Sequence, residues 1–314
     1  MLGVERMCHL AEVSRAGYYR HLTETVPDEA AMTLQANIQE IVLLHHRRYG
    51  YRRVTAELNR RGLTINHKRV LRIMRSDNLL AVRFRKFIVT TDSRHECEVH
   101  LNLAARMTLT GINQLWVADI TYIRLRAEFV FLAVVIDRFS RKAIGWSLDR
   151  TLAARVAVAA LKQAIGSRQP LPGTVHHSDQ GIQYACGDYV DILKAHHLIP
   201  SMSRPANPYD NAACESFMKT LKQEEIYCQD YRDFEDLSTH LEEFIGNYYN
   251  RLRLHSALGY CTPEEFERDA AATTAPGGIT EAATVKYFIP PPGATAVPES
   301  ADQPVSELRE GRSS

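Results

Sequence analysis

Cysteine pairs, long apolar runs and targeting signals are what this sequence lacks. Its six cysteines are scattered over 314 residues without any C-x-x-C spacing, which argues against a disulfide framework and against a structural zinc site. No apolar run approaches the roughly 18 residues that a membrane helix needs. The beginning of the chain also lacks the basic and then hydrophobic pattern of a signal peptide. We therefore expect a cytoplasmic protein with no membrane partner and no bound zinc.

Charge is nearly balanced overall but is unevenly distributed along the chain. The formal net charge is +1, and 45% of the residues are hydrophobic, which is ordinary for a globular chain of about two domains. Between residues 45 and 95, however, fourteen Lys or Arg stand against three Asp or Glu. A basic block of this kind indicates nucleic-acid binding.

The same basic block has the apolar periodicity of short helices. Residues 38–48 and 51–61 form two candidate helices, Gly62 ends the second, and Asn66 can cap a third that runs to Arg75. This pattern predicts a helix-turn-helix, in which the last helix enters a DNA groove. The alternative is a basic helix that is merely solvated. The residues that we expect to contact DNA are His67, Lys68, Arg69, Arg72 and Arg75, with Arg52 and Arg53 on the preceding helix.

Beyond a polar linker, the pattern changes to strands that alternate with helices. Three β-rich segments come first, and their short connections favour antiparallel pairing. The expected elements are strands 114–123, 128–137 and 141–149, helix 151–165, strand 173–177, helix 187–197, strand 198–202 and a final helix. This order is that of an α/β fold with a mixed sheet, the ribonuclease H-like fold. In that fold the first strand lies beside the end of the fourth.

Two aspartates stand on the strands that this fold would bring together. Asp119 lies within the first strand and Asp179 directly follows the fourth, in apolar segments where an unpaired carboxylate is costly. A third acid, Glu215, lies on the final helix. Taken alone, Glu215 is explained by a surface ion pair with Lys219, four residues on. However, 59 and then 35 residues intervene between successive acids, and these spacings favour one shared site.

The final helix has an apolar face and a charged face. Prolines upstream exclude an earlier start, so Asp210 or Asn211 is placed to cap it. Its apolar stripe consists of Ala213, Phe217 and Leu221. Lys222 follows Glu215 by seven residues, which returns it to within about 20° of the same face of an α-helix. We expect Lys219 and Lys222 to bind DNA phosphates, the alternative being that Lys222 is a solvated surface lysine.

Five motifs resemble those of a known family, the integrase-like OrfB-type transposases of the bacterial insertion-sequence family numbered three. They are WVADITYI, VVIDRFSRKAIGWSL, HHSDQGIQYA, SRPANPYDNAACESFMKTLKQEE and FIGNYYNRLRLHSALGYCTPEEFE. They occur in the family's order and spacing, and the resemblance covers roughly residues 38–267. Ile182 departs from the pattern, because the family usually has a small polar residue there. The resemblance implies a retroviral-integrase-type catalytic core with Asp119, Asp179 and Glu215 as its acids.

Three carboxylates suit the transfer of a phosphoryl group between DNA strands. Two metal ions about 3.5–4 Å apart can stabilise both the attacking and the leaving oxygens. Hard oxygen ligands favour Mg²⁺, with Mn²⁺ as a substitute, and no other cofactor is expected. We expect Asp119 to lie between the ions, Asp179 to bind one and Glu215 the other. Without metal, mutual repulsion should raise the pKa of at least one of these acids.

The sequence also contains three histidine pairs and a cysteine beside the third acid. The pairs at residues 45–46, 176–177 and 196–197 are most simply explained by one buried and one solvated ring each. His177 is the expected exception, because it stands two residues before an acid. Cys214 is expected to be a packing residue.

The domain boundaries follow from these patterns. We expect a small helical segment (1–37), a helix-turn-helix domain (38–95), a linker (96–112), the catalytic core (113–226), a helical extension (227–269) and a disordered tail (270–314). The tail prediction rests on its six prolines and its few large apolar residues.

The predicted function is that of a DNA transposase. It would bind the terminal inverted repeats of its element, cleave the 3′ ends and join them to target DNA. We expect a homo-oligomer on DNA, associated with the nucleoid when bound, and an upstream helix-turn-helix frame product, either fused to the chain or separate. Two alternatives are a DNA-binding regulator without catalysis and a nuclease of the same fold that hydrolyses DNA without strand transfer.

Overall fold

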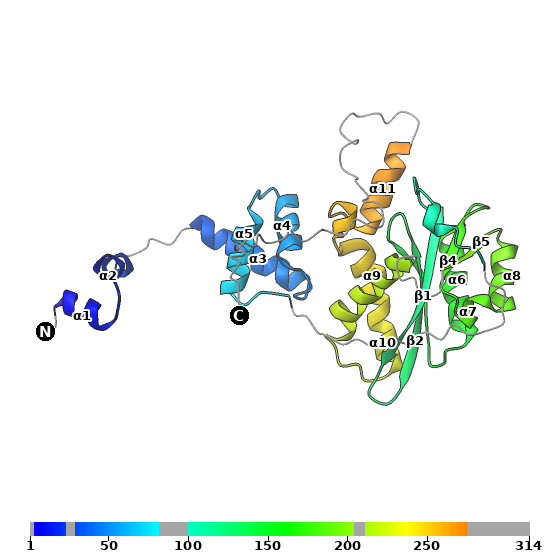
Figure 1. The fold of residues 1–314 in the computed structure, drawn as a ribbon, viewed down its shortest axis with the longest axis horizontal. Helices are drawn as coiled ribbons and strands as arrows, with labels where there is room; N and C mark the ends of the chain where they lie inside the picture. Colours follow the sequence, from blue (N-terminus) through cyan, green and yellow to red (C-terminus); the bar gives the residue numbers. More distant parts are fainter. Residues whose placement is uncertain (1–2, 23–28, 82–99, 204–210, 275–314) are drawn as a thin grey trace, which may run out of the picture. The chain divides into compact units, whose positions relative to one another are not determined.

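Two compact units make up the chain (Figure 1). The computed structural model describes residues 3–22, 29–81, 100–203 and 211–274. The first unit comprises Met1–Ile88 and Lys222–Cys228, and the second comprises Val89–Leu221 and Gln229–Ser314. Within the described residues, no helix is both long and apolar enough to cross a membrane. The predicted boundary at residues 95–96 lies outside the described residues.

The first unit is helical, as predicted. Its helices are α1 (Val4–Leu10), α2 (Arg15–Leu22), α3 (Glu29–Leu44), α4 (Tyr51–Arg60), α5 (His67–Ser76) and the π-helical segment Lys222–Ile226. Gly62 ends α4 with a φ of +85°, a conformation that L side chains rarely adopt. The side chain of Asn66 caps α5 by accepting the N–H of Lys68 at 2.8 Å. The predicted turn between α4 and α5 is therefore confirmed.

The core of the first unit is formed by apolar side chains at helical spacing. The fully buried members are Ile38, Ile41, Val42, Tyr49, Val54, Leu58, Val70 and Met74. Helix α3 begins well before its predicted start at residue 38. The added segment is rich in alanine and has Glu29 in its first turn, and both features stabilise a helix N-terminus.

The second unit is built on a five-stranded mixed sheet. Its strands are β1 (Leu115–Arg124), β2 (Phe129–Asp137), β3 (Ala143–Asp149), β4 (Val175–Ser178) and β5 (Ile199–Met202). Their order across the sheet is β3-β2-β1-β4-β5. The first three strands are antiparallel, while β4 runs parallel to β1 and β5 parallel to β4. The predicted mixed sheet, with three antiparallel strands followed by strands that alternate with helices, is confirmed.

Helices cover both faces of this sheet (Figure 1). On one side lie α6 (Ala154–Arg168), α7 (Ile182–Ala185) and α8 (Gly187–Ala195), and on the other lie α9 (Ala212–Leu221), α10 (Phe234–Glu242) and α11 (Pro263–Thr274). Trp116 and Ala118 of β1 point into the core that α6 and α8 complete. Side chains alternate along a strand, so Val117 and Asp119 point to the opposite face.

Several elements were not predicted from the sequence. Helix α7 is only one turn long, and the segments Lys222–Ile226 and Glu243–Leu252 are π-helical; the i→i+5 bonding of a π-helix has no clear sequence periodicity. Residues 270–274 belong to α11, so the predicted start of the disordered tail at residue 270 is wrong. Residues 275–314 lie outside the described residues.

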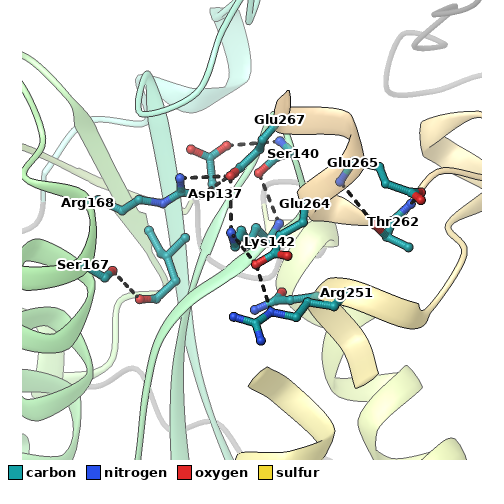
Figure 2. Close-up of polar contacts among 12 residues, drawn as sticks. Asp137, Ser140, Lys142, Ser167, Arg168, Arg251, Thr262, Glu264, Glu265 and Glu267 are labelled. Carbon is teal, nitrogen blue, oxygen red and sulfur yellow. Dashed lines mark hydrogen bonds and ion pairs between the residues drawn. The ribbon is translucent and has the colours of Figure 1, made fainter. Parts of the chain in front are cut away.

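Helix α11 is attached to the sheet by ion pairs (Figure 2). Lys142, beside the start of β3, lies 3.3 Å from Glu264 and 3.5 Å from Glu267. Arg168, at the end of α6, also binds Glu267, with Nη1 to Oε2 at 3.0 Å. These groups are half-buried for the most part, so the network fixes α11 more firmly than exposed pairs would.

The buried carboxylate of Asp137 has a structural role at the end of β2. It accepts backbone N–H groups from Asn113 at 2.7 Å, Phe139 at 2.9 Å and Ser140 at 3.1 Å. Burial raises the pKa of Asp137, while the bonds from Asn113 and Ser140 oppose that rise. Asp137 therefore holds the connection between β2 and β3.

The close approach of β3 to α6 depends on Gly145. A Cβ atom there would lie 2.3 Å from the carbonyl oxygen of Ala160 and 2.7 Å from the nitrogen of Ala164. Both are backbone atoms, so relief requires that the helix move. By contrast, a Cβ on Gly166, in the same helix, would have nothing within 4 Å.

We predict that Gly145→Ala lowers the free energy of unfolding by about 1–3 kcal/mol or more, the cost of overpacking a core. Gly166→Ala is the matched control and should raise stability by about 0.4–1 kcal/mol, because alanine favours a helix. Urea denaturation of the full chain, followed by far-UV circular dichroism, measures both. Equal stabilities of the two variants would show that β3 and α6 are not in close contact.

Candidate active site

Asp119 and Asp179 are brought side by side by the pairing of β1 with β4. The parallel register matches Trp116 with His176 and Val117 with His177. Asp119 lies two residues further along β1, on the same face as Val117, and Asp179 lies two residues after His177, directly beyond the end of β4 at Ser178. Both aspartates are half-buried. This register favours the sequence prediction that these two acids meet, which stays a prediction.

Backbone N–H groups orient both aspartates. Oδ1 of Asp119 accepts the N–H of Ile120 at 2.9 Å, and Oδ1 of Asp179 accepts the N–H of Gly181 at 2.9 Å. A Cβ on Gly181 would lie 2.9 Å from the same Asp179 oxygen. Glycine at this position therefore allows the tight turn in which Asp179 binds its own backbone.

Glu215 lies in the first turn of α9, and a buried amide fixes the start of that helix. Nδ2 of Asn211 donates to the carbonyl oxygen of Ala118 at 3.0 Å, the residue just before Asp119. The apolar stripe of α9 is buried as predicted and also includes Cys214. Glu215 itself is exposed. The contact of Asn211 with β1 thus joins the helix of one predicted acid to the strand of another.

The thiol of Cys214, next to Glu215, has a raised pKa. It is fully buried, in agreement with a packing role. Burial is the main reason that its pKa is raised well above the ordinary value, and the carboxylates of Asp119, Asp179 and Glu215 raise it further. The guanidinium of Arg138 opposes this rise in the pKa of Cys214.

The pKa of Glu215 is raised, but not for the predicted reason. Its cause is desolvation by the surrounding protein and not repulsion between carboxylates. The pKa of Tyr184 is raised as well. Burial raises the pKa of its phenol well above the ordinary value, with further contributions from Tyr189, Asp179 and Asp119. Its hydroxyl has no hydrogen-bond partner among the described residues.

The donor set fits magnesium in kind, but its geometry is incomplete. Carboxylate oxygens are the hard ligands that Mg²⁺ prefers. In the part of the chain that the structure describes, however, no three His, Cys, Asp or Glu residues gather closely enough to hold a metal ion. Asp119 lies in β1 and Asp179 directly follows β4, whereas Glu215 is on α9, which Asn211 joins to β1.

The predicted DNA-binding side chains of the first unit are exposed with one exception. Those on the surface are Arg52, His67, Lys68, Arg69, Arg72 and Arg75. Arg53 is half-buried and binds Glu224 at 3.1 Å. Of the two lysines expected beside Glu215, Lys219 is exposed on α9, while Lys222 is half-buried in the π-helical segment of the first unit. The regular α-helical spacing behind the Lys222 prediction ends at Leu221.

The histidine pairs behave differently from one another. His45 is buried and His46 is exposed, as expected, whereas both rings at residues 196–197 are exposed and both at residues 176–177 are buried. The expectation of one buried and one solvated ring is therefore wrong for the pair at residues 196–197, while the pair at residues 176–177 departs from it at His177, the expected exception. Burial is also the main cause that lowers the pKa of His176 to about 3, with His177 contributing.

Comparison with known proteins agrees with this arrangement. A model described as an integrase core domain matches residues 110–208, a second with the same description matches 196–263, and an HTH-like domain matches 28–87. Transposase InsF for insertion sequence IS3A of Escherichia coli (strain K12) is 35% identical over 269 residues, which are 84% of this chain and 93% of that protein. The chain belongs to the IS3-family transposases.

One further transposase and two solved integrase cores are also similar to this chain. The transposase for insertion sequence element IS904 of Lactococcus lactis is 36% identical over 236 residues, covering 75% of this chain and 93% of that protein. Among solved structures, the catalytic core domain of BIV integrase is 20% identical with a TM-score of 0.40, covering 51% of this chain and 97% of that chain. The HTLV-2 integrase catalytic core in complex with magnesium is 18% identical with a TM-score of 0.37, covering 50% and 97%.

The family matches agree with the predicted organisation of the transposase. An N-terminal helical HTH-like region precedes an integrase core with a mixed sheet. The two integrase-core matches enclose Asp119, Asp179 and Glu215. An HTH-like domain in a transposase indicates DNA binding.

Two residues near the acids were missed or misassigned from the sequence. Asn211 was expected as a helix cap, but its amide donates across to β1, and its Oδ1 has no partner among the described residues. Asp210 lies outside the described residues. Tyr184 carried no signal at all, because a tyrosine in a short apolar helix is indistinguishable from a core residue.

Proposed function

We propose that this transposase cleaves the 3′ ends of its element and joins them to target DNA by metal-dependent phosphoryl transfer. Asp119, Asp179 and Glu215 are the proposed catalytic and metal-binding residues. The observation that supports the proposal is the β1–β4 register, which matches Val117 with His177, the residues two positions before Asp119 and Asp179. Such a pair of carboxylates is otherwise costly at a half-buried position.

Hydrogen bonds within the protein orient these carboxylates without a bound cation. The N–H groups of Ile120 and Gly181 restrict the rotation of the two aspartates. Partial desolvation disfavours the charge of Glu215 and so raises its pKa, and a neighbouring cation would lower that pKa by stabilising the carboxylate. Asn211 limits how far α9 can move from β1.

Magnesium is the proposed metal, and Mn²⁺ should substitute for it, since both accept carboxylate oxygens. When bound, the ions would stabilise the attacking and leaving oxygens of the phosphodiester. Asp119 would contribute to both ions, Asp179 to one and Glu215 to the other. No covalent protein intermediate is needed, because positioning and charge stabilisation suffice for phosphoryl transfer.

DNA recognition is assigned to the first unit, with α5 as the helix that enters a groove. Its cationic side chains are exposed, and Arg69, Arg72 and Arg75 make no ion pair within the described part of the chain. Lys219 and Lys222 are proposed to bind phosphates of the element ends. The proposed partners are the terminal inverted repeats and target DNA. Homo-oligomerisation and an upstream frame product stay predictions.

The acid assignment predicts a complete loss of chemistry without a loss of DNA binding. Asp119→Asn, Asp179→Asn and Glu215→Gln should each reduce cleavage and joining of an end-bearing oligonucleotide by at least about a hundredfold. Their affinities for the same oligonucleotide should stay within about twofold of the wild type. The control is Asp188→Asn, which removes an exposed carboxylate of the same unit.

Three results would contradict this assignment. A variant that cleaves normally would remove its residue from the site. A wild-type chain that binds ends but never cleaves them, at any divalent metal concentration, would indicate a regulator. Cleaved ends without any joined product would indicate a nuclease.

The DNA-binding assignment predicts a change in salt dependence. Removing one cation that binds a phosphate lowers the slope of log affinity against log salt by roughly 0.9. Replacing Arg69, Arg72 and Arg75 by Gln should therefore weaken end binding and flatten the slope by about 2 to 3. The control replaces Arg60 and Arg61 by Gln, since both already pair with Glu57. Fluorescence anisotropy at several salt concentrations measures the slope, and an unchanged slope would show that α5 does not contact phosphates.

A further inference from the structure

The two adjacent histidines of β4 point to opposite faces of the sheet. His176 faces the α8 side, where its Nε2 lies 3.0 Å from the hydroxyl of Tyr189. His177 faces the side of the acids, because its register partner on β1 is Val117, which shares a face with Asp119. Asp179 follows His177 by two residues, directly after the end of β4 at Ser178.

The ring of His177 lies between Ser201 of β5 and Ser203, which directly follows β5. Ser201 is its register partner on β5, and the hydroxyl of Ser201 lies 2.8 Å from Nδ1 of His177. The hydroxyl of Ser203 lies 3.0 Å from Nε2. Both serines and the histidine are buried. The ring therefore spans two successive rows of the same sheet face.

The directions of these hydrogen bonds form one consistent chain. The N–H of Leu103 donates to the hydroxyl oxygen of Ser201 at 2.9 Å. The single proton of that hydroxyl can then be donated to Nδ1 of His177, so the ring carries its proton on Nε2 and donates it to Ser203. The hydroxyl of Ser203 in turn donates to the carbonyl oxygen of Ser178 at 3.2 Å.

Ser203 contacts both sequence neighbours of Asp179. Its N–H also donates to the carbonyl oxygen of Ser178, at 2.9 Å. Its own carbonyl oxygen accepts Nε2 of Gln180 at 3.0 Å. Ser203 thus holds the backbone of Ser178, before Asp179, and the side chain of Gln180, after it. His177 in turn orients the hydroxyl of Ser203.

We propose that His177 and Ser203 form a brace that positions Asp179 for metal binding, a role that rests on the proposed function. Neither residue touches the metal or the DNA in this proposal. Both act through Ser178 and Gln180, the two neighbours of Asp179. The groups that orient a metal ligand usually influence metal affinity about 10- to 100-fold, so loss of the brace should weaken metal binding measurably.

The test compares two hydroxyl deletions on opposite faces of β4. Ser203→Ala removes the hydroxyl that links His177 to the carbonyl oxygen of Ser178, and Ser203→Thr keeps a hydroxyl in the same place. Tyr189→Phe is the matched control, because it removes an equally short hydroxyl contact to the neighbouring histidine on the other face. Asp119→Asn marks the metal site itself. Mn²⁺ binding to the full chain without DNA is measured by electron paramagnetic resonance, and the Mg²⁺ concentration for half-maximal cleavage is measured in parallel.

We expect Ser203→Ala to weaken Mn²⁺ binding about tenfold and to raise the half-maximal Mg²⁺ concentration by a similar factor. End-DNA affinity should not change, and Ser203→Thr should recover most of the metal affinity. Tyr189→Phe should bind Mn²⁺ like the wild type.

Two results would overturn the brace while leaving the proposed function intact. One is a wild-type Mn²⁺ affinity in Ser203→Ala when Asp119→Asn no longer binds the ion. The other is an equal loss in Ser203→Ala and Tyr189→Phe, which would reflect a general loosening of β4. A wild-type chain that neither binds Mn²⁺ nor cleaves DNA would overturn the proposed function, and the brace with it.

Discussion

The parallel pairing of β1 with β4 is the constraint on which the rest of the second unit depends. It matches Val117 with His177, two residues before Asp119 and Asp179, close to the point where β4 ends at Ser178. A carboxylate within a fully buried strand would be desolvated at high cost, whereas these two are half-buried. The parallel pairing of β5 with β4 then brings Ser203 to the same end of the sheet, and Asn211 ties α9 to β1 one residue before Asp119.

The basic charge of the first unit is divided between internal ion pairs and an exposed surface. Arg48 binds Glu225 at 2.5 Å and Arg53 binds Glu224 at 3.1 Å. These acids belong to residues 222–228, which are grouped with the N-terminal helices and not with the rest of the integrase core. The exposed arginines of α5 form no ion pair within the described residues. A count of charges along the sequence therefore overstates how many cations are available to DNA.

Local patterns predicted much of this structure, and the failures have physical causes. Strand order, the Asn66 cap and the buried stripe of α9 follow from residue spacing and turn chemistry. The adjacency of Asp119 and Asp179 followed from the fold class once three antiparallel strands were recognised. The contact of Asn211 with β1 joins residues 93 positions apart, and no local pattern encodes it. The same holds for His177, whose partners lie on another strand.

The central claim is that the strand register and α9 create a divalent metal site at Asp119, Asp179 and Glu215. A crystal structure of the full chain grown with Mn²⁺, with anomalous diffraction data, tests it most directly. The account predicts an anomalous peak bound by carboxylate oxygens of both Asp119 and Asp179, with Glu215 as a further ligand. A peak held by other residues, or ordered aspartates without any peak at saturating Mn²⁺, would contradict it.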